Sequence, residues 1–396
     1  MFAHIDADAF FASALQRKYP SLRGKPLLAL GMGGGCVIAA SYEAKACGVK
    51  TGMRLVDARK LCPNATAVPS DFREACAASQ EIESILKEQC PVLEKYSVDE
   101  WFAEMKALVG GIPKDCNEWA QRMQIDVSKR VGLTISIGVG PTITLSKMAS
   151  EYRKPAGVTV LTDTDNEAFL RDRPAAAIPG IGPRRMLHAE SEGWHTAWDF
   201  AQADAERVSS LFGKNGRELQ SELQGAPIYD IQRTHVPPKS ISRCRSFRAT
   251  TDQSIMFSHL LDHLTYTVMK MRREHLMCTE IQVWLRDATY KHAGRRCKLS
   301  QAMDTEEQVL PYLRSCFTRL VAEIPKSTQA GFGLGGLCPK AVLQYSLFEE
   351  PTKTIGSEDI QSTLDKIHDR YGRDAIVRAS ATPTKGDKKA SLNVIE

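Results

Sequence analysis

Two adjacent carboxylates stand at the tip of a short apolar hairpin. In Val92–Met105, two runs of alternating apolar residues flank a polar tip that contains Asp99 and Glu100, a pattern typical of two antiparallel strands joined by a turn. Strict alternation relaxes at a turn, so both carboxylates can converge on one point. Carboxylates among apolar neighbours repel each other unless a cation lies between them. The pair suggests a divalent metal site, although such a pair can also be simply solvated.

A third carboxylate comes from the N-terminus of the chain. Met1–Phe11 begins as a short strand whose alternation places Asp6 and Asp8 on one face, and a helix follows. If this strand lies beside the hairpin, Asp6 completes a set of oxygen ligands. Mg²⁺ takes one or two carboxylates per ion and leaves its other positions to water and substrate phosphates. Phosphoryl transfer by two metal ions needs this arrangement.

Three further residues could contact an anion. Tyr42 and Lys45 are three residues apart in a predicted short helix that ends at Gly48, so they share one helix face. Lys154 follows another helix, just before a Pro-Ala-Gly turn, and could reach a triphosphate. A solvated helix face is the alternative for the first pair. For Lys154, the alternative is a lysine that satisfies the negative end of its helix.

The order of predicted elements brings the acids together. The strand at Met1, the hairpin and the strand 133–139 alternate with helical patterns, which cover 55–61, 75–88 and 118–130. Strand, helix, hairpin, helix, strand is the order of a split βαβ, ferredoxin-like sheet. In that sheet the first strand and the hairpin are neighbours. The glycines at 31–35 lack the Gly-Lys-Ser/Thr of a phosphate loop and precede a strand, which favours a hairpin connection.

A predicted helical region, 165–228, contains a turn suited to nucleic acid. Its Pro179-Gly180-Ile181-Gly182 turn enters a helix and exposes backbone N–H groups, which can bind a phosphate without reading sequence. This is a helix-hairpin-helix signature. A plain interhelical turn is the alternative.

The following region is basic. Residues 231–330 contain 16 Lys and Arg against 9 Asp and Glu, although the whole chain has a net charge of only +5, which indicates a polyanion bound there. Lys239, Arg243, Arg245 and Arg248 lie in an extended pattern that fits a phosphate backbone. Helices at 256–275 and 306–324 with strands at 279–285 and 331–337 predict a second α+β domain. His259 and His263 have helical metal spacing but no third ligand, so a surface pair is expected.

Composition limits the remaining possibilities. A chain of 396 residues should hold two to four domains. It contains no long apolar run and no signal-peptide pattern, so a cytoplasmic protein without a membrane partner is expected. The 11 cysteines include no Cys-x-x-Cys and are expected to be reduced and mostly buried. Near the end, Gln344–Phe348 is a short apolar peptide of the kind that docks in a partner's pocket, and a helical stripe at 360–371 precedes a polar, disordered tail.

Together these motifs resemble the Y-family translesion DNA polymerases, most closely the UmuC-type catalytic subunit of bacterial polymerase V. The resemblance runs from Met1 to about Arg378. Its motifs occur in the family's order: Asp6-Ala7-Asp8-Ala9-Phe10-Phe11, Tyr42-Glu43-Ala44-Lys45, Ser97-Val98-Asp99-Glu100, Lys154-Pro155-Ala156-Gly157, Pro179-Gly180-Ile181-Gly182 and Ser240-Ile241-Ser242-Arg243-Cys244-Arg245-Ser246-Phe247.

The resemblance implies roles for individual residues. Two Mg²⁺ ions would be held by Asp6, Asp99 and Glu100, with the Ala7 carbonyl as a further ligand. The nucleotide would be bound by Phe10, Phe11, Tyr42, Lys45 and Lys154, and Phe11 would stack beneath the deoxyribose and exclude a 2′-hydroxyl. DNA would be bound by Gly180, Gly182, Arg184, Arg243, Arg245 and Arg248. A β sliding clamp would be bound by Gln344, Leu347 and Phe348.

The resemblance also implies domains, partners and rivals. We expect an α+β chain with a ferredoxin-like palm (1–165, fingers about 20–75), a helical thumb (166–230), a linker (231–238), an α+β little finger (239–338) and a tail (339–396). The expected partners are primed DNA, dNTP, a β clamp, a UmuD-type accessory subunit and a recombinase filament. The expected function is error-prone translesion synthesis in the SOS response. The chain departs from the family at two places. Many members have Arg at the position of Lys45, and the clamp peptide contains Tyr345-Ser346 in place of the commoner residues. A nucleotidyl cyclase and a catalytically inactive, clamp-bound mutasome adaptor are the alternatives.

Overall fold

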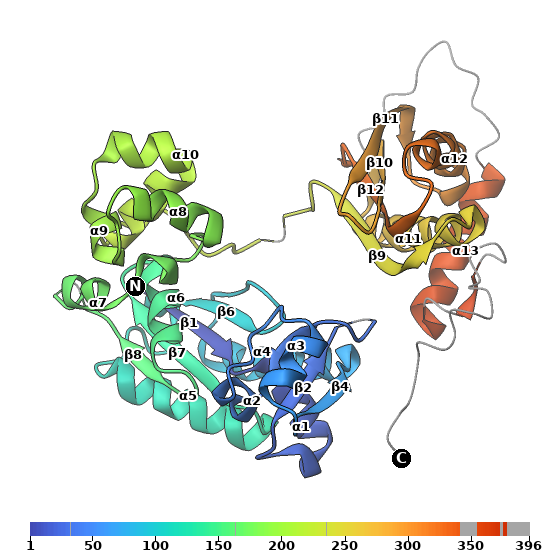
Figure 1. Cartoon of the computed structure of the whole chain (residues 1–396). Coiled ribbons are helices and arrows are strands. Elements are labelled where there is room, and N and C mark those ends of the chain that lie inside the picture. Colours follow the sequence, from blue (N-terminus) through green and yellow to red (C-terminus); the bar gives the residue numbers. More distant parts are fainter. Residues whose placement is uncertain (32, 163, 235, 341–354, 373–374, 378–396) are drawn as a thin grey trace. The chain divides into compact units, whose positions relative to one another are not determined.

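The computed structural model describes all residues except 32, 163, 235, 341–354, 373–374 and 378–396 (Figure 1). The chain divides into two compact units, Met1–His235 (unit 1) and Val236–Glu396 (unit 2). The predicted clamp peptide Gln344–Phe348 and the predicted polar tail lie outside the residues that the structure describes. No helix in the described part of the chain is both long and apolar enough to cross a membrane.

The first sheet of unit 1 has the predicted ferredoxin-like pairing. Its strand order is β5-β6-β1-β7-β8, β1 pairs antiparallel with both β6 and β7, and β8 is parallel to β7. The hairpin thus lies directly beside the first strand, as expected from the order of elements. The strands are β1 Phe2–Ala7, β5 Leu93–Lys95, β6 Glu100–Glu104, β7 Ile135–Gly140 and β8 Val158–Val160.

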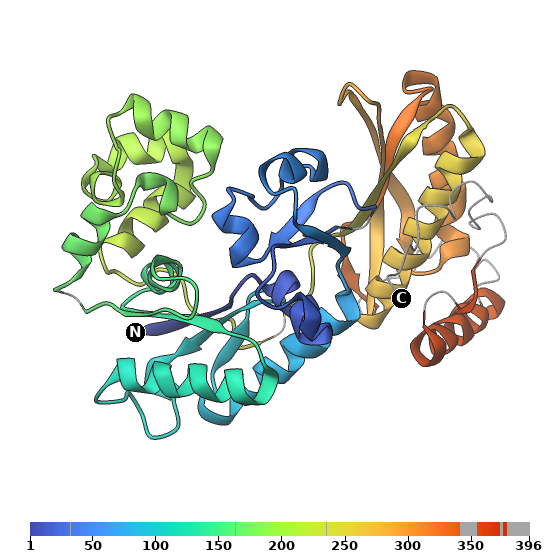
Figure 2. The same ribbon diagram turned by 60° about the horizontal axis from the view of Figure 1, so that its bottom comes forward.

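Helices cover both faces of this sheet. Ala3, Ile5 and Ala7 of β1 pack in one core with α4 (Phe72–Gln89) and α5 (Cys116–Val131). The opposite face, which carries His4 and Asp6, is covered by α6 (Ile143–Tyr152), and α5 and α6 lie on opposite sides of the sheet in both ribbon views (Figures 1 and 2). A Cβ at Gly138 of β7 would clash with the backbone of Ser146 and Ser150 on α6. Glycine is therefore needed for this close helix–strand contact.

A small sheet is inserted after α1 (Phe10–Lys18) and a 3₁₀ turn at Pro20–Leu22. Its strand order is β3-β2-β4, and β2 and β3 are antiparallel, so the glycines at 31–35 join a hairpin as predicted. The strands are β2 Leu27–Leu30, β3 Val37–Ala40 and β4 Thr66–Pro69. The helices are α2 Tyr42–Ala46 and α3 Leu55–Leu61, and α3 has the predicted bounds.

Four helices form the last part of unit 1. They pack around Phe200, Phe212 and Leu219, and Thr142 at the start of α6 donates a hydrogen bond to the backbone carbonyl of the buried Glu222 (3.0 Å). The chain kinks at Gly213, where φ is 66°. The helices are α7 Asn166–Asp172, α8 Pro183–Ser191, α9 Ala197–Gln202 and α10 Ala205–Leu223, and short 3₁₀ helices span Met105–Ala107 and Ala175–Ala177.

The segment after α10 binds back to the first sheet. The backbone N–H of Gln232 donates to Glu94 (2.7 Å), and Arg233 donates to Glu104 (2.6 Å). Ile231 is buried in a small apolar cluster on the sheet. The first residues of the predicted linker are thus part of the structure of unit 1.

Unit 2 is an α+β domain, as predicted. Its sheet has the order β11-β10-β12-β9, with β13 paired to β10, and its core includes residues from α11 and α12. The C-terminal α13 is attached through Arg272, which bonds Asp365 (2.6 Å) and Asp304 (2.7 Å). The strands are β9 Ile241–Thr250, β10 Leu276–Arg286, β11 His292–Met303, β12 Ser327–Gly335 and β13 Cys338–Pro339; the helices are α11 Gln253–Arg273, α12 Glu306–Glu323 and α13 Ile355–Tyr371.

One strand was missed, and two expectations about burial are wrong. The strand β11 was not predicted, because His292–Met303 is mostly polar and has one face exposed. His259 and His263 are buried in α11 rather than a surface pair, at 6% and 0% exposure. The cysteines are all free thiols, as expected, but only four are buried, and Cys36, Cys47, Cys76 and Cys244 are exposed.

Candidate active site

Asp6 and Glu100 face each other across two paired strands. Asp6 of β1 is the register partner of Glu100 of β6, and side chains opposite each other on antiparallel strands project from the same face of the sheet. Among the described residues, three potential metal ligands, His4, Asp6 and Glu100, have ligand atoms within 4.8 Å of one another. The structure therefore brings together two of the three predicted acids and adds a histidine.

Asp99 lies beside this group without being part of it. Its backbone carbonyl accepts a hydrogen bond from the N–H of Ala7 (2.9 Å), and its carboxylate accepts one from the Ser97 hydroxyl (2.5 Å). Ala7, the predicted carbonyl ligand, follows Asp6 at the end of β1. The hairpin thus places Asp99 next to the end of the strand, as expected, with its carboxylate bonded to its own turn.

His4 presents a free nitrogen to the acids. It is fully buried, and its Nδ1 lies 2.6 Å from the Ser150 hydroxyl, which donates its own hydrogen to the Lys147 carbonyl (2.8 Å). Nδ1 is therefore the donor, and Nε2, 3.6 Å from Glu100, has no hydrogen-bond partner among the residues that the structure describes. Burial lowers the pKa of His4 to about 4, so the ring is neutral near pH 7. A bare nitrogen beside two carboxylates fits a divalent metal ion.

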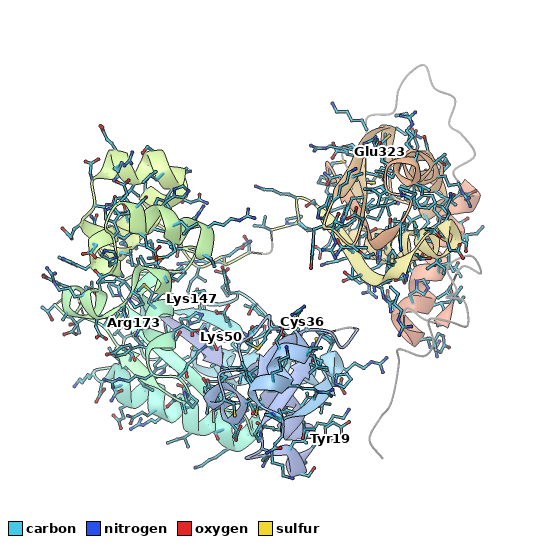
Figure 3. All side chains as sticks on the ribbon, in the orientation of Figure 1. Tyr19, Cys36, Lys50, Lys147, Arg173 and Glu323 are labelled. Carbon is cyan, nitrogen blue, oxygen red and sulfur yellow. The ribbon has the colours of Figure 1, made fainter. Side chains whose placement is uncertain are left out.

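Two lysines neutralise the carboxylates. Lys147 of α6 (labelled in Figure 3) forms an ion pair with Glu100, and Lys154 lies 2.6 Å from both Asp6 and Glu151. Burial raises the pKa of Asp6 to about 7 despite the opposing charge of Lys154. Burial acts in the same direction on Glu100, but the Lys147 ammonium outweighs it, and the pKa of Glu100 is lowered to about 2. A metal ion must therefore compete with two ammonium groups.

Asp8 organises the surroundings instead of joining the acids. One carboxylate oxygen accepts hydrogen bonds from Ser136 (2.7 Å) and from the Tyr42 hydroxyl (3.3 Å), and the other accepts one from the N–H of Ala156 (2.8 Å). Asp8 is fully buried. Through these bonds it fixes α2 and the turn that follows Lys154.

Tyr42 and Lys45 lie together on α2, as their spacing predicted. The helix begins at Ser41, whose hydroxyl accepts the N–H of Ala44, and the Lys45 ammonium lies 4.4 Å from the centre of the Tyr42 ring. Burial lowers the pKa of Lys45, and the positive charge of Lys154 acts in the same direction. The two lysines therefore form a positive region close to the acids, which suits an anionic ligand.

The two phenylalanines after Asp8 have different environments. Phe10 is only 2% exposed and belongs to the core below the sheet. Phe11 is partly exposed, and its ring makes edge contacts with Phe10 and with the exposed Phe72 of α4. Of the two side chains, Phe11 is the one accessible to a nucleotide.

The Pro-Gly-Ile-Gly turn lies close to α6. Gly180 has φ of +89°, which favours glycine, and Gly182 precedes the first turn of α8. A hollow of about 540 Å³ is lined by this turn and by Lys147, Met148 and Glu151. Arg184 is exposed on α8. The turn thus opens towards α6, the helix that carries Lys147.

The predicted DNA-binding arginines of β9 differ from one another. Arg243 is held by Asp262 of α11 (3.1 Å) and lies over the Tyr266 ring. Arg245 and Arg248 are exposed. The clamp-binding residues Gln344, Leu347 and Phe348 lie outside the described residues.

Sequence reasoning missed His4, Lys147 and Ser150. His4 precedes Asp6 by two residues and so shares its strand face, a signal that was present in the sequence. Lys147, Ser150 and Lys154 recur at helical spacing, but only the tertiary contact of α6 with β1 shows which face meets the acids.

The chain matches known proteins over both units. Residues 5–151 match the impB/mucB/samB family and residues 238–347 match the impB/mucB/samB family C-terminal domain. DNA polymerase IV of Moorella thermoacetica is 30% identical over 385 residues, which cover 94% of each chain; DNA polymerase IV of Stenotrophomonas maltophilia is 30% identical over 356 residues, 88% of this chain and 96% of the relative.

Solved structures show the same fold. A Y-family DNA polymerase chimera, Dbh-Dpo4(243-245)-Dbh, superposes with a TM-score of 0.74 at 22% identity and covers 85% of this chain and 99% of the other. DinB from Sulfolobus solfataricus superposes with a TM-score of 0.58 at 22% identity, covering 84% and 98%. The first sheet corresponds to a palm, and unit 2 contains the little finger. The chain belongs to the Y-family DNA polymerases, the impB/mucB/samB family, and is a nucleotidyltransferase.

Proposed function

We propose that this polymerase adds dNTPs to primed DNA by two-metal catalysis, with Asp6, Asp99 and Glu100 as ligands of two Mg²⁺ ions. The observation that carries the proposal is the pairing of Asp6 with Glu100 beside Asp99 and the end of β1. Bound there, Mg²⁺ would stabilise negative charge on the attacking primer 3′-oxygen and on the departing pyrophosphate.

The chain's own residues would position the substrates. Lys154 is paired with Asp6 in this structure. On nucleotide binding its side chain would turn away from Asp6 and pair with the triphosphate, beside Lys45 and Tyr42. Phe11 would lie under the sugar and exclude a 2′-hydroxyl. The turn at Gly180–Gly182, with Arg184, and the exposed Arg245 and Arg248 of β9 would hold the DNA backbone. A solved relative in the same fold is an insertion ternary complex of Dbh DNA polymerase, which supports DNA and dNTP as ligands.

The decisive experiment is primer extension by Asp99→Asn. We expect extension to be lost, because the carboxylate charge is removed without loss of volume, while the affinity for primed DNA is kept. Asp126→Asn is the matched control, since Asp126 lies on α5 and forms an ion pair with Arg130, and it should extend normally. Near-normal extension by Asp99→Asn would refute the metal assignment.

Translesion synthesis is the proposed cellular role. The inserted fingers region consists of three short strands and two short helices, which offer little bulk to close over a base pair. We expect extension opposite an abasic site to approach that on an intact template. A complete block at the abasic site would contradict this role.

Membership of the family excludes the nucleotidyl cyclase alternative, and the extension assay decides whether the chain is an inactive adaptor. The relatives named above are DNA polymerase IV, so the UmuC type, the SOS role and the cytoplasmic location stay predictions. So do the β clamp, UmuD-type subunit and recombinase filament. Extension assays with each purified partner would test whether it is required.

A further inference from the structure

Two of the three thiols in the fingers region (about 20–75) lie next to each other, and the polymerase reaction uses neither. Cys47 ends α2 and Cys62 ends α3, and their sulfur atoms lie 3.1 Å apart. A disulfide bond is about 2.05 Å long, so a shift of roughly 1 Å would join them. The adjacent chain segments are already close, since a Cβ added at Gly48 would lie 4.0 Å from the Leu61 side chain.

The two thiols are not equivalent. Cys47 is exposed, whereas Cys62 is 3% exposed and belongs to the apolar core of the fingers region. The Cys62 thiol donates its hydrogen to the Cys47 sulfur, and this hydrogen bond raises the pKa of Cys62. A thiolate is the form that attacks disulfides, and the exposed Cys47 is the thiol of the pair that a solute can reach. Cys47 can therefore react first with a solute, and Cys62 is placed to attack second.

We propose that Cys47 and Cys62 form a redox-modification site that takes a low-molecular-weight disulfide, such as oxidised glutathione, and closes into an intramolecular disulfide. The Cys47 thiolate attacks one sulfur of the oxidant, forming a mixed disulfide and releasing one glutathione thiolate. Cys62 then loses its proton, attacks the Cys47 sulfur and releases the second glutathione. The protein loses two electrons and two protons, and the oxidant becomes two glutathione thiols.

The bond has a consequence for nucleotide binding, and this consequence rests on the proposed function. Cys47 lies two residues after Lys45 on the helix that also carries Tyr42. Joining the ends of α2 and α3 therefore constrains the helix assigned to the triphosphate. We expect the KM for dNTP to differ between the oxidised and the reduced protein.

The site itself is tested without a polymerase assay. The full-length protein is equilibrated with mixtures of reduced and oxidised glutathione, quenched with an alkylating agent and mapped by peptide mass spectrometry. We expect a linked Cys47–Cys62 peptide that disappears on reduction. Cys36 and Cys76, which are exposed, serve as internal controls and should carry only glutathione.

Two variants identify the order of attack. In Cys62→Ala, Cys47 should retain glutathione, because the second thiol is missing. Cys47→Ser, at an exposed position, should leave Cys62 unmodified. The proposal is overturned if wild-type Cys47 keeps glutathione while Cys62 stays a thiol, or if both remain thiols where Cys36 is modified. Because peptide masses are the readout, a chain without extension activity gives the same answer. An unchanged KM in fully oxidised protein would overturn the link to nucleotide binding.

Discussion

Asp6 shows a conflict between burial and charge at a single residue. It is 6% exposed on the central strand, and its nearest cation is the Lys154 ammonium. Burial raises its pKa to about 7, although a metal ligand must be ionised. The buried carboxyl group of Asp6 can therefore be accommodated in three ways: protonated, paired with Lys154, or bound to a metal ion.

This conflict predicts that Mg²⁺ binds more tightly as the pH rises. Below its pKa of about 7, Asp6 holds a proton that must leave when the metal binds, so the Mg²⁺ affinity should increase by up to about tenfold per pH unit between about pH 6 and pH 7 and then level off. Isothermal titration without nucleotide measures this. Asp6→Asn should bind weakly with a flat pH profile, and a flat profile in the wild type would contradict the assignment.

Phe11 should determine sugar selectivity. Replacing it by Ala removes the ring that is proposed to lie under the deoxyribose, so Phe11→Ala should insert ribonucleotides at least about tenfold more efficiently relative to dNTPs, because only steric exclusion separates the two sugars. Single-nucleotide insertion kinetics with dNTP and rNTP measure the ratio. Phe72→Ala, which removes the exposed neighbour of Phe11, is the control and should retain most of the selectivity.

At the scale of elements, α6 and the turn after it hold the groups of the candidate site in place. One helix and the turn after it provide Lys147 for Glu100, Ser150 for His4 and Lys154 for Asp6. Its distance from the sheet is set by Gly138, where the backbones of β7 and α6 meet. The geometry of the site therefore depends on a residue that does no chemistry.

Gly138→Ala should damage both stability and activity. The added Cβ would clash with the backbone of Ser146 and Ser150, and overpacking of this kind costs about 1–3 kcal/mol. Urea unfolding and primer extension measure the two effects. Gly35→Ala is the control, since a Cβ at Gly35 would meet no atom within 4 Å; equal effects of the two changes would show that the close contact is unimportant.

Local patterns predicted elements well wherever one face is apolar. The hairpin, α3 and the ferredoxin-like order were predicted because periodicity and turn residues agree. The strand β11 was missed because His292–Met303 carries few apolar residues, and its place in the sheet comes from pairing with β10. His263 was misplaced because a histidine is polar in isolation yet is buried beneath the sheet of unit 2. Such cases depend on contacts between distant segments, which a single sequence does not display.

At the scale of the whole chain, unequal charge separates the two units. The basic excess of residues 231–330 falls almost entirely in unit 2, so salt should weaken DNA binding mainly through this unit. Within unit 2, exposed arginines should contribute to DNA affinity, whereas arginines paired within the unit should contribute mainly to its stability.

Arg245→Ala and Arg243→Ala form a matched pair for this idea. Arg245 is exposed, so its loss should lower the slope of log affinity against log salt by about 0.7–0.9, the value of one phosphate contact. Arg243 is held by Asp262, so its replacement should mainly reduce the free energy of unfolding. Fluorescence anisotropy at several salt concentrations and urea unfolding measure the two effects. Identical salt slopes for Arg245→Ala and wild type would refute the contact.

The ion pairs of Lys147 with Glu100 and of Lys154 with Asp6 would also make the proposed metal site favour divalent over monovalent cations. A sodium or potassium ion that displaced a tethered ammonium would exchange one positive charge for another and would gain nothing in Coulomb energy. A divalent ion brings one charge more than the group it replaces, and an arriving triphosphate gives the displaced Lys154 a new counterion. In the proposed site, loading would therefore be favourable when metal and nucleotide arrive together, and monovalent ions would be poor competitors.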